Sequence, residues 1–432
     1  MMTEVKNYLV SLYKFVVNSI AFLPGLISVG FIALAMGSLA LENHGVTEYL
    51  INRASYLVIN NEDTARTVLS TLVGGLISLM VFSFSMVMIL LSQASSDYSP
   101  RLLPGLISNK RHQVVLGIYL GTILFNIFII ISILPDAGAY ELPGFSALLA
   151  IVLGIICLLL FVYFIHSISN EIQVSHILKK IFKQTKTRLF YLEQFERRHS
   201  KEEIPMTSEW NEIAGNISGY FQGITKDALV EIAMSADTVI QVVPINGIFV
   251  LEGSPVLRSQ HQLNEEVLKE VMSCLQYSDG ELVTENYLYG FKQITEIAIK
   301  AMSPGINDPG TAINAIDYLT DLLATRMKLD DSETYKDQTG TVRVIVNTVN
   351  FQDLIYNIMA SLRQYCKHDV VVVQKLINML KLLLITEKEK EIYPSTIMEQ
   401  LNVLMEDAKR SISNQKDQEK LNHLVASIDP SI

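Results

Sequence analysis

The hydrophobic and polar positions divide the chain into an apolar first part and a mixed second part. Four long runs in the first part carry no charged side chain, apart from Arg66 at the start of the second. As helices rising ~1.5 Å per residue, such runs are long enough to cross a ~30 Å hydrocarbon layer. The predicted membrane-spanning helices are residues 16–41, 66–96, 114–134 and 142–165. The pattern therefore predicts a four-helix transmembrane domain over residues 16–170.

Amphipathic patterns flank this domain on both sides. Residues 1–15 have the apolar spacing of a helix lying at the membrane interface. Residues 171–204 read as a juxtamembrane helix that carries a cluster of cations. These cations are Lys179, Lys180, Lys183, Lys186 and Arg188. They are suited to binding anionic lipid headgroups, and an ordinary solvated helix face is an equally good interpretation.

The second part of the chain alternates between strand and helix patterns. Residues 205–260 predict a small β-rich module, and residues 261–432 predict a mainly helical domain. Within the module, strands over 238–244 and 248–252 are joined at Asn246-Gly247, a dipeptide typical of a type I′ hairpin. The predicted fold class is a mainly α membrane protein with four transmembrane helices and a cytoplasmic α+β domain.

The distribution of Lys and Arg sets the expected orientation. Basic residues precede the first run, separate the second from the third, and follow the fourth. The other two loops are mainly acidic. Because loops rich in Lys and Arg stay in the cytoplasm, both termini are predicted to be cytoplasmic.

The amino-acid composition argues against several classes of protein. Only 18% of residues are charged and half are hydrophobic, whereas a soluble domain carries about 25% charge. The net charge of −10 argues against nucleic-acid binding. The three cysteines, Cys157, Cys274 and Cys366, lack the spacing of a metal or redox site. No catalytic motif is recognisable, so we expect neither an enzyme nor a bound cofactor or metal.

Polar residues within the runs are the first candidate site. Thr71, Ser78, Ser85 and Ser92 recur every seven residues and therefore share one helix face. This hydroxyl stripe, together with Asn126 of the third run, marks either close helix packing or a path lined by water or ions. Three residues after the second run, Asp97, Ser99 and Arg101, are candidates for the cytoplasmic mouth of such a path.

A second candidate is the segment SPGINDPGTA, residues 303–312. Pro304 and Gly305 end one predicted helix, while Asp308 and Pro309 are suited to begin the next. Ser303, Asn307, Asp308 and Thr311 therefore form either a ligand-binding or hinge loop or a well-capped helix junction.

Several segments in order along the chain carry a resemblance to one family. They are SPRLL (99–103), QVVLG (113–117), SGYFQ (218–222) and GFKQITEIAIKAMSPGINDPGTA (290–312), followed by Asp317. The chain resembles a family of predicted bacterial membrane proteins, domain of unknown function 2254. The resemblance implies four spans and a cytoplasmic domain, and it implies no functional residues. The chain departs from the family at Asp97 and at Glu285-Asn286, where Gln and Gln-Asp are expected.

Two functions fit these observations. The first is a homo-oligomeric channel-like or transport protein with a cytoplasmic regulatory domain, because the four spans contain no charge that a proton-coupled carrier would need. The alternative is a membrane-anchored scaffold or sensor whose cytoplasmic domain binds a ligand or partner. A liposome flux assay separates the two.

Overall fold

The structure is a computed structural model of all 432 residues. It describes residues 21–42, 44–54, 56, 58–59, 61–97, 110–133, 142–171, 173–198, 207, 209–278, 286–387 and 392–428. The chain divides into two compact units, residues 1–173 and 174–432. We call them the membrane unit and the C-terminal unit, and each is described by itself. The predicted interfacial helix, residues 1–15, lies outside the described residues.

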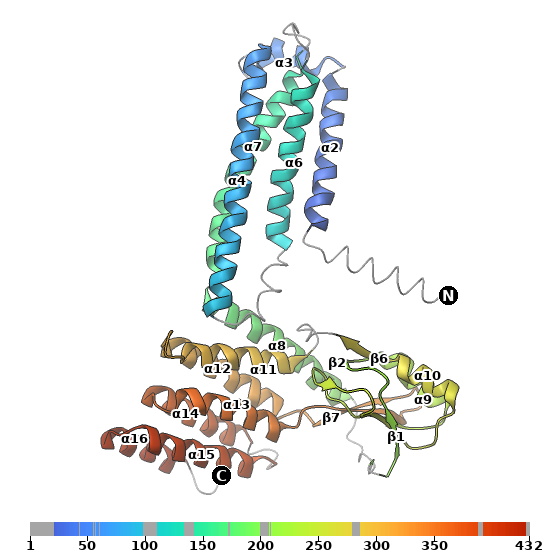
Figure 1. Ribbon diagram of the computed structural model, residues 1–432, viewed down its shortest axis with the longest axis vertical. Helices are drawn as coiled ribbons and strands as arrows, with labels where there is room; N and C mark the ends of the chain where they lie inside the picture. The colour runs from blue at the N-terminus through green and yellow to red at the C-terminus, as the bar shows by residue number, and fades with distance from the viewer. Residues whose placement is uncertain are drawn as a thin grey trace. The chain divides into compact units, whose positions relative to one another are not determined.

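The membrane unit contains four long apolar helices that run side by side in Figure 1. They are α2 (Phe22–Glu42), α4 (Glu62–Asp97), α6 (Lys110–Ser132) and α7 (Gly144–Glu171). Each is long and apolar enough to cross a membrane, which confirms the four predicted spans. A short helix that the sequence pattern did not predict, α3 (Val46–Ala54), lies between the first two.

Helix α6 contacts all three other spans. Two of its glycines allow α2 to approach closely. A Cβ on Gly121 would lie 2.6 Å from the ring of Phe31, and one on Gly117 would lie 2.9 Å from Ile27. These glycines therefore mediate packing within one chain.

The loop between α2 and α4 is tied to the start of α7. The carboxylate of Glu42 accepts a hydrogen bond from the Ser146 amide at 2.8 Å. The Thr47 hydroxyl donates to the same carboxylate and accepts from the Phe145 amide at 3.0 Å. Two of the free amides at the N-terminus of α7 are thus satisfied by side chains at the end of α2 and in α3.

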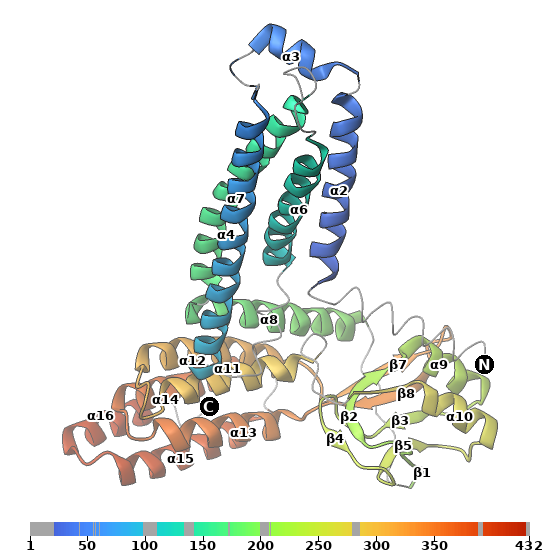
Figure 2. The ribbon, with the colours of Figure 1, turned by 45° about the horizontal axis from the view of Figure 1, so that its top comes forward.

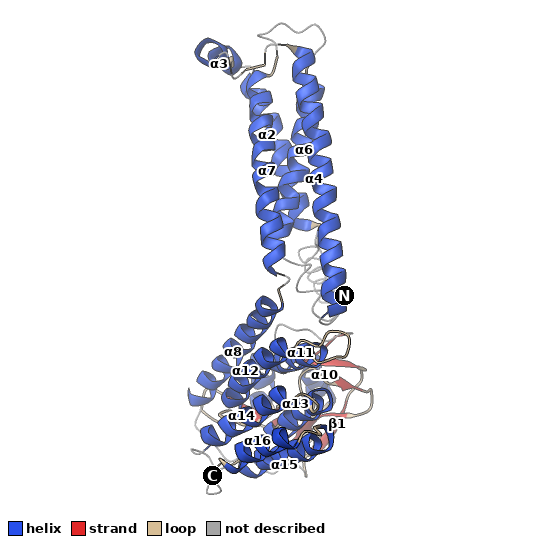
Figure 3. Ribbon diagram, turned by 90° about the vertical axis from the view of Figure 1, so that its left-hand side faces the viewer, coloured by secondary structure: helices blue, strands red, loops and turns tan. Residues whose placement is uncertain are grey.

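The C-terminal unit combines helices with two small sheets (Figure 3). Its helices are α8 (Val174–Arg198), α9 (Lys226–Ser235), α10 (Glu265–Ser273), α11 (Tyr287–Ala301), α12 (Pro309–Arg326), α13 (Phe351–Cys366), α14 (Val370–Glu387), α15 (Pro394–Ser411) and α16 (Gln415–Ala426). Its strands are β1 (Asn211–Ala214), β2 (Gly219–Ile224), β3 (Ile240–Val242), β4 (Phe249–Val250), β5 (Pro255–Ser259), β6 (Leu275–Ser278), β7 (Ser332–Lys336) and β8 (Val342–Asn347). The prediction of a mainly α protein with an additional α+β region is confirmed.

The two sheets have the strand orders β1-β5-β3-β8-β7 and β4-β2-β6. Strand β8 pairs in parallel with β3, with Ile240 opposite Val344, and the other pairs are antiparallel. The sheets therefore continue beyond residue 260 into the region predicted to be helical. Helices α11 and α12 are inserted between β6 and β7, while the strands gather beside α9 and α10 in Figure 2.

The hairpin predicted at Asn246-Gly247 is wrong. Strands β3 and β4 belong to different sheets, because β3 is paired on both sides by β5 and β8. The turn is instead hydrogen-bonded to β2. The Gly247 amide donates to Phe221 O at 2.7 Å, and the Phe221 amide donates to Ile248 O at 3.0 Å. Gly247 has a φ of +85°, whereas Asn246 is not among the described residues with positive φ, so the turn is not type I′.

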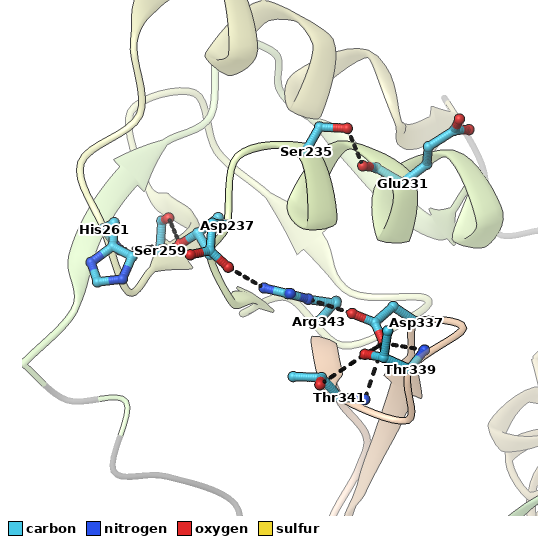
Figure 4. Close-up of polar contacts among 10 residues, drawn as sticks. Glu231, Ser235, Asp237, Ser259, His261, Asp337, Thr339, Thr341 and Arg343 are labelled. Carbon is cyan, nitrogen blue, oxygen red and sulfur yellow. Dashed lines mark hydrogen bonds and ion pairs between the residues drawn. The ribbon is translucent and has the colours of Figure 1, made fainter.

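An ion-pair cluster fixes the β7–β8 hairpin to the rest of its sheet (Figure 4). Arg343 on β8 donates from Nε to Asp337 at 2.8 Å and from Nη1 to Asp237 at 3.0 Å. Asp337 also accepts from the amides of Thr339 and Thr341 at 2.9 and 3.1 Å. The Thr339 hydroxyl also donates to Asp337 at 2.5 Å, and this bond and the one from Arg343 hold the pKa of Asp337 well below its usual range.

Candidate functional site

The hydroxyl stripe lies on the outer face of the membrane unit. Thr71, Ser78, Ser85 and Ser92 are all exposed on α4. The Thr71 hydroxyl donates to Thr67 O at 2.7 Å, and the Ser78 hydroxyl donates to Gly74 O at 2.9 Å. A Cβ on Gly74 would have no neighbour within 4 Å. The stripe is therefore a surface of small residues, and these two hydroxyls are satisfied by their own helix.

Asn126 lies inside the membrane unit, away from the exposed stripe. It is fully buried on α6, and its Nδ2 donates to Thr122 O at 2.7 Å. The Cys157 thiol of α7 donates to the Thr122 hydroxyl at 3.4 Å. Ser83 of α4 and Tyr119 of α6 are also fully buried. We call these five residues the polar core of the membrane unit.

The polar core contains a buried polar atom without a hydrogen-bond partner among the described residues, the Asn126 Oδ1. The hydroxyls of Ser83 and Tyr119, which are also buried, lie close enough to interact with each other. An unsatisfied polar atom in an apolar interior costs roughly 2–7 kcal/mol, depending on the reference state. A water molecule or an ion that reached the Asn126 Oδ1 would relieve that cost.

Sequence reasoning missed four of the five polar-core residues. The available signal was the spacing of Tyr119, Thr122 and Asn126, which at i, i+3 and i+7 share one face of α6. Nothing in the sequence pointed to Ser83 or Cys157. The candidate mouth cannot be placed: the Asp97 side chain, Ser99 and Arg101 lie outside the described residues.

The SPGINDP segment forms the junction between α11 and α12. Asp308 caps α12 by accepting from the Thr311 amide at 3.1 Å and from its hydroxyl at 2.6 Å. These two bonds lower the pKa of Asp308. The Ser303 hydroxyl donates to Lys300 O at 2.7 Å, and Asn307 adopts a left-handed φ of +48°. Asn307 and Asp308 are exposed, and the bonds of Ser303, Asp308 and Thr311 are made within the junction.

The cations of α8 separate into three groups. Lys179, Lys180 and Lys183 are exposed. Lys186 forms an ion pair with Asp321 on α12. Arg188 is partly buried, with its guanidinium 5.8 Å from the ring of Tyr191. Only the first group therefore remains available as a simple basic surface.

Arg188 also lines a pocket of about 100 Å³ in the C-terminal unit. Helix α8, both sheets and the N-terminal turn of α11 all contribute to its wall. Among the residues that the structure describes, no group of three His, Cys, Asp or Glu side chains is arranged to hold a metal ion. The charged residues in its wall are Arg188, Lys226 and Glu333.

Comparisons with known proteins give the chain a family. The sequence profile of the family described as "Predicted membrane protein (DUF2254)" matches residues 17–382, and the chain belongs to this family. Uncharacterized proteins of Mycobacterium bovis and Mycobacterium tuberculosis are each 24% identical to it over 331 residues, which is 73% of this chain. The chain spans 63% of the length of these curated relatives. No solved structure matches it.

Proposed function

We propose that this membrane protein is a homo-oligomeric, channel-like protein of the bacterial inner membrane. In this proposal both termini and the C-terminal unit are cytoplasmic, as the loop charges indicate, and the C-terminal unit regulates the spans. In this proposal the protein performs no covalent chemistry. The exposed lysines of α8, which are Lys179, Lys180 and Lys183, contact anionic headgroups.

The polar core carries the proposal. Its buried polar groups, which include the unsatisfied Asn126 Oδ1 and the neighbouring hydroxyls of Ser83 and Tyr119, lie within helices that are otherwise apolar. Such groups are expensive in a membrane interior, so their presence there favours a role that needs polarity. Hydroxyl, amide and thiol groups without a formal charge suit the passage of water, ions or small neutral solutes better than a proton-coupled cycle.

The outer face of α4 supports assembly from several copies of the chain. Thr71, Gly74, Ser78 and Ser85 present small side chains where a lipid-facing helix has no need of them. Small residues allow two helix backbones to approach closely. In the proposal this face packs against a second copy of the same chain.

Flux through liposomes tests the proposal. Vesicles containing the purified full-length protein are loaded with K⁺, Cl⁻ or a small neutral solute, and release is followed under applied voltage and at several pH values. We expect release of at least one of these from wild-type vesicles and a marked loss in Asn126→Leu. The absence of any release in wild-type vesicles overturns the proposal.

Orientation is tested separately by labelling intact cells. A cysteine introduced at Glu48 should react with an impermeant reagent from outside, and one introduced at Lys183 should not. The reverse pattern would place the C-terminal unit outside the cytoplasm.

A second candidate function is a membrane-anchored sensor, and the pocket beside Arg188 favours it. In that case the spans anchor the C-terminal unit and ligand binding is the whole activity. Ligand binding without any flux would favour the sensor over the channel.

A further inference from the structure

The pocket of the C-terminal unit is formed by segments far apart in the sequence. Its lining includes Arg188 from α8, Lys226 from α9, Asn246 from the turn before β4, Tyr287 from α11, Glu333 from β7 and Thr348 after β8. Its volume of about 100 Å³ is below the range of roughly 300–1,000 Å³ that is usual for drug-sized ligands. The pocket therefore suits a molecule of only a few non-hydrogen atoms.

One anion and one cation in the wall neutralise each other. Lys226 Nζ lies 3.7 Å from a carboxylate oxygen of Glu333. The hydroxyl of Tyr335 lies between them, accepting from Lys226 and donating to Glu333. Burial and the neighbouring Glu333 raise the pKa of Tyr335, so this hydroxyl keeps its proton.

Arg188 supplies a charge that nothing in the wall balances. Among the described residues no ion pair of Arg188 is found, and its guanidinium lies 5.8 Å from the centre of the Tyr191 ring. Its Nε is buried without a hydrogen-bond partner. The net charge of the wall is therefore +1, and the N-terminal turn of α11 adds a favourable dipole for a negative group.

Two further residues of the wall carry buried polar atoms without a partner among the described residues. These atoms are the side-chain oxygen of Asn246 and the hydroxyl of Thr348. An Asn oxygen accepts hydrogen bonds, and a Thr hydroxyl both donates and accepts. The three residues that carry these atoms, Arg188, Asn246 and Thr348, all line the pocket, and native interiors normally satisfy such atoms.

We propose that this pocket binds a small carboxylate that also carries a hydroxyl or amino group. The planar guanidinium of Arg188 matches a carboxylate with two parallel hydrogen bonds, and a net charge of +1 favours a singly charged anion over a phosphate dianion. The second polar group of the ligand donates to Asn246 or bonds to the Thr348 hydroxyl. Glu333, already bonded to Tyr335, disfavours additional negative charge.

Ligand binding would act on α8, which begins at Val174, directly after the last span ends at Glu171. A carboxylate held between Arg188 and the strands would restrain α8 against the sheet side of its own unit. That this restraint regulates the spans rests on the proposed channel function. The binding of the carboxylate itself does not depend on that function.

Binding of defined probes to the purified full-length protein tests the proposal. Isothermal calorimetry and thermal melting are measured with lactate, glycine, acetate and inorganic phosphate. Lactate or glycine should bind at least about ten-fold more tightly than acetate, because acetate leaves Asn246 and Thr348 without a partner. Binding should be independent of flux, so a protein that binds but does not conduct refutes only the channel.

Matched variants of α8 assign the site. Arg188→Gln should weaken lactate binding at least about ten-fold. Lys183→Gln, which removes an exposed cation from the same helix, should leave binding unchanged. Arg188→Lys keeps the charge and should retain part of the affinity, which separates loss of the ligand contact from misfolding. The proposal is overturned if no carboxylate binds, if phosphate binds more tightly than lactate, or if Arg188→Gln binds normally.

Discussion

The side-chain amide of Asn286 donates to the main-chain carbonyl of Asn246 at 2.8 Å, and it occupies the space beside Gly247. A Cβ on Gly247 would lie 2.5 Å from the Asn286 Nδ2. The Asn286 Oδ1 at the same time caps α11 by accepting from the Leu288 amide at 3.0 Å. One side chain thus ties the turn after β3 to the start of a helix 40 residues later.

Gly247→Ala should destabilise the protein through this contact as well as through backbone strain. Gly253 is a matched control, because its φ of +84° nearly equals the +85° of Gly247 while its Cβ would have no neighbour within 4 Å. Gly253→Ala should lower the free energy of unfolding by about 1–2 kcal/mol through strain alone, and Gly247→Ala should lower it by clearly more. Unfolding of the full-length protein in detergent measures both.

A double-mutant cycle isolates the contact. In an Asn286→Ala background the neighbouring amide is absent, so Gly247→Ala should cost only as much as Gly253→Ala does. Equal costs of the two glycine substitutions in the wild-type protein would contradict the close approach.

Arg326 anchors several elements from a fully buried position. Its guanidinium donates to the Tyr287 hydroxyl and Leu329 O, each at 3.1 Å, to Asp331 at 2.7 Å and to Val349 O at 2.6 Å. Arg326→Met should destabilise the protein by about 3–5 kcal/mol, because four partners, of which Tyr287 and Leu329 are buried, lose their donor together. Denaturant unfolding measures the loss.

The control for Arg326 is an exposed ion pair in the same unit. Arg258 on β5 bonds to Glu212 on the edge strand β1 at 2.9 Å. Arg258→Met should change the free energy of unfolding by no more than about 1 kcal/mol. Similar losses for the two variants would show that burial of Arg326 contributes little.

Asp337 should make the stability of the β7–β8 hairpin depend on pH. Its folded pKa is depressed by Thr339 and Arg343, so its contribution is present above the ordinary carboxyl pKa of about 4. The contribution is lost as the pH falls through the lower folded value. Asp337→Asn should therefore lower the melting temperature at pH 7, and the difference from wild type should shrink below pH 4.

Glu419 provides the comparison for this pH series, because it is an exposed acid on α16. Glu419→Gln should leave the melting curve nearly unchanged at every pH. A constant difference between Asp337→Asn and wild type from pH 7 to pH 3 would contradict the role of the ionised carboxylate.

Sequence patterns predicted the spans because an uncharged apolar run of a whole helix length is typical of a helix that contacts lipid. They did not predict which way the polar residues point. A seven-residue spacing shows that Ser78 and Ser85 share a face, yet only packing shows that this face is outside while Asn126 lies inside. The hairpin failed for a related reason. The parallel partner of β3 is β8, about 100 residues away, and no local signal identifies such a partner.

The same limit applies to the C-terminal pocket. Arg188 belongs by sequence to a run of cations suited to lipid headgroups, whereas in the structure it faces residues from β7 and from the segment after β8. Lys179 and Lys183 keep the exposure that the pattern predicted. Helical periodicity thus identified a basic helix, and long-range packing alone distinguished the member that lines a pocket.

The last prediction separates assembly from conduction with two substitutions of the same kind. Ser78→Leu places bulk on the exposed face of α4, so it should weaken association between copies, because leucine holds helix backbones apart. Asn126→Leu removes the buried amide and its unsatisfied oxygen, so it should reduce flux while leaving the oligomer intact. Light scattering in detergent measures the oligomer, and liposome release measures conduction. Ser78→Ala serves as the control, because it keeps the small volume and loses only a hydroxyl that is bonded to its own helix. If Ser78→Leu leaves the oligomer unchanged and Asn126→Leu dissociates it, the assignments of the two faces of the membrane unit are reversed.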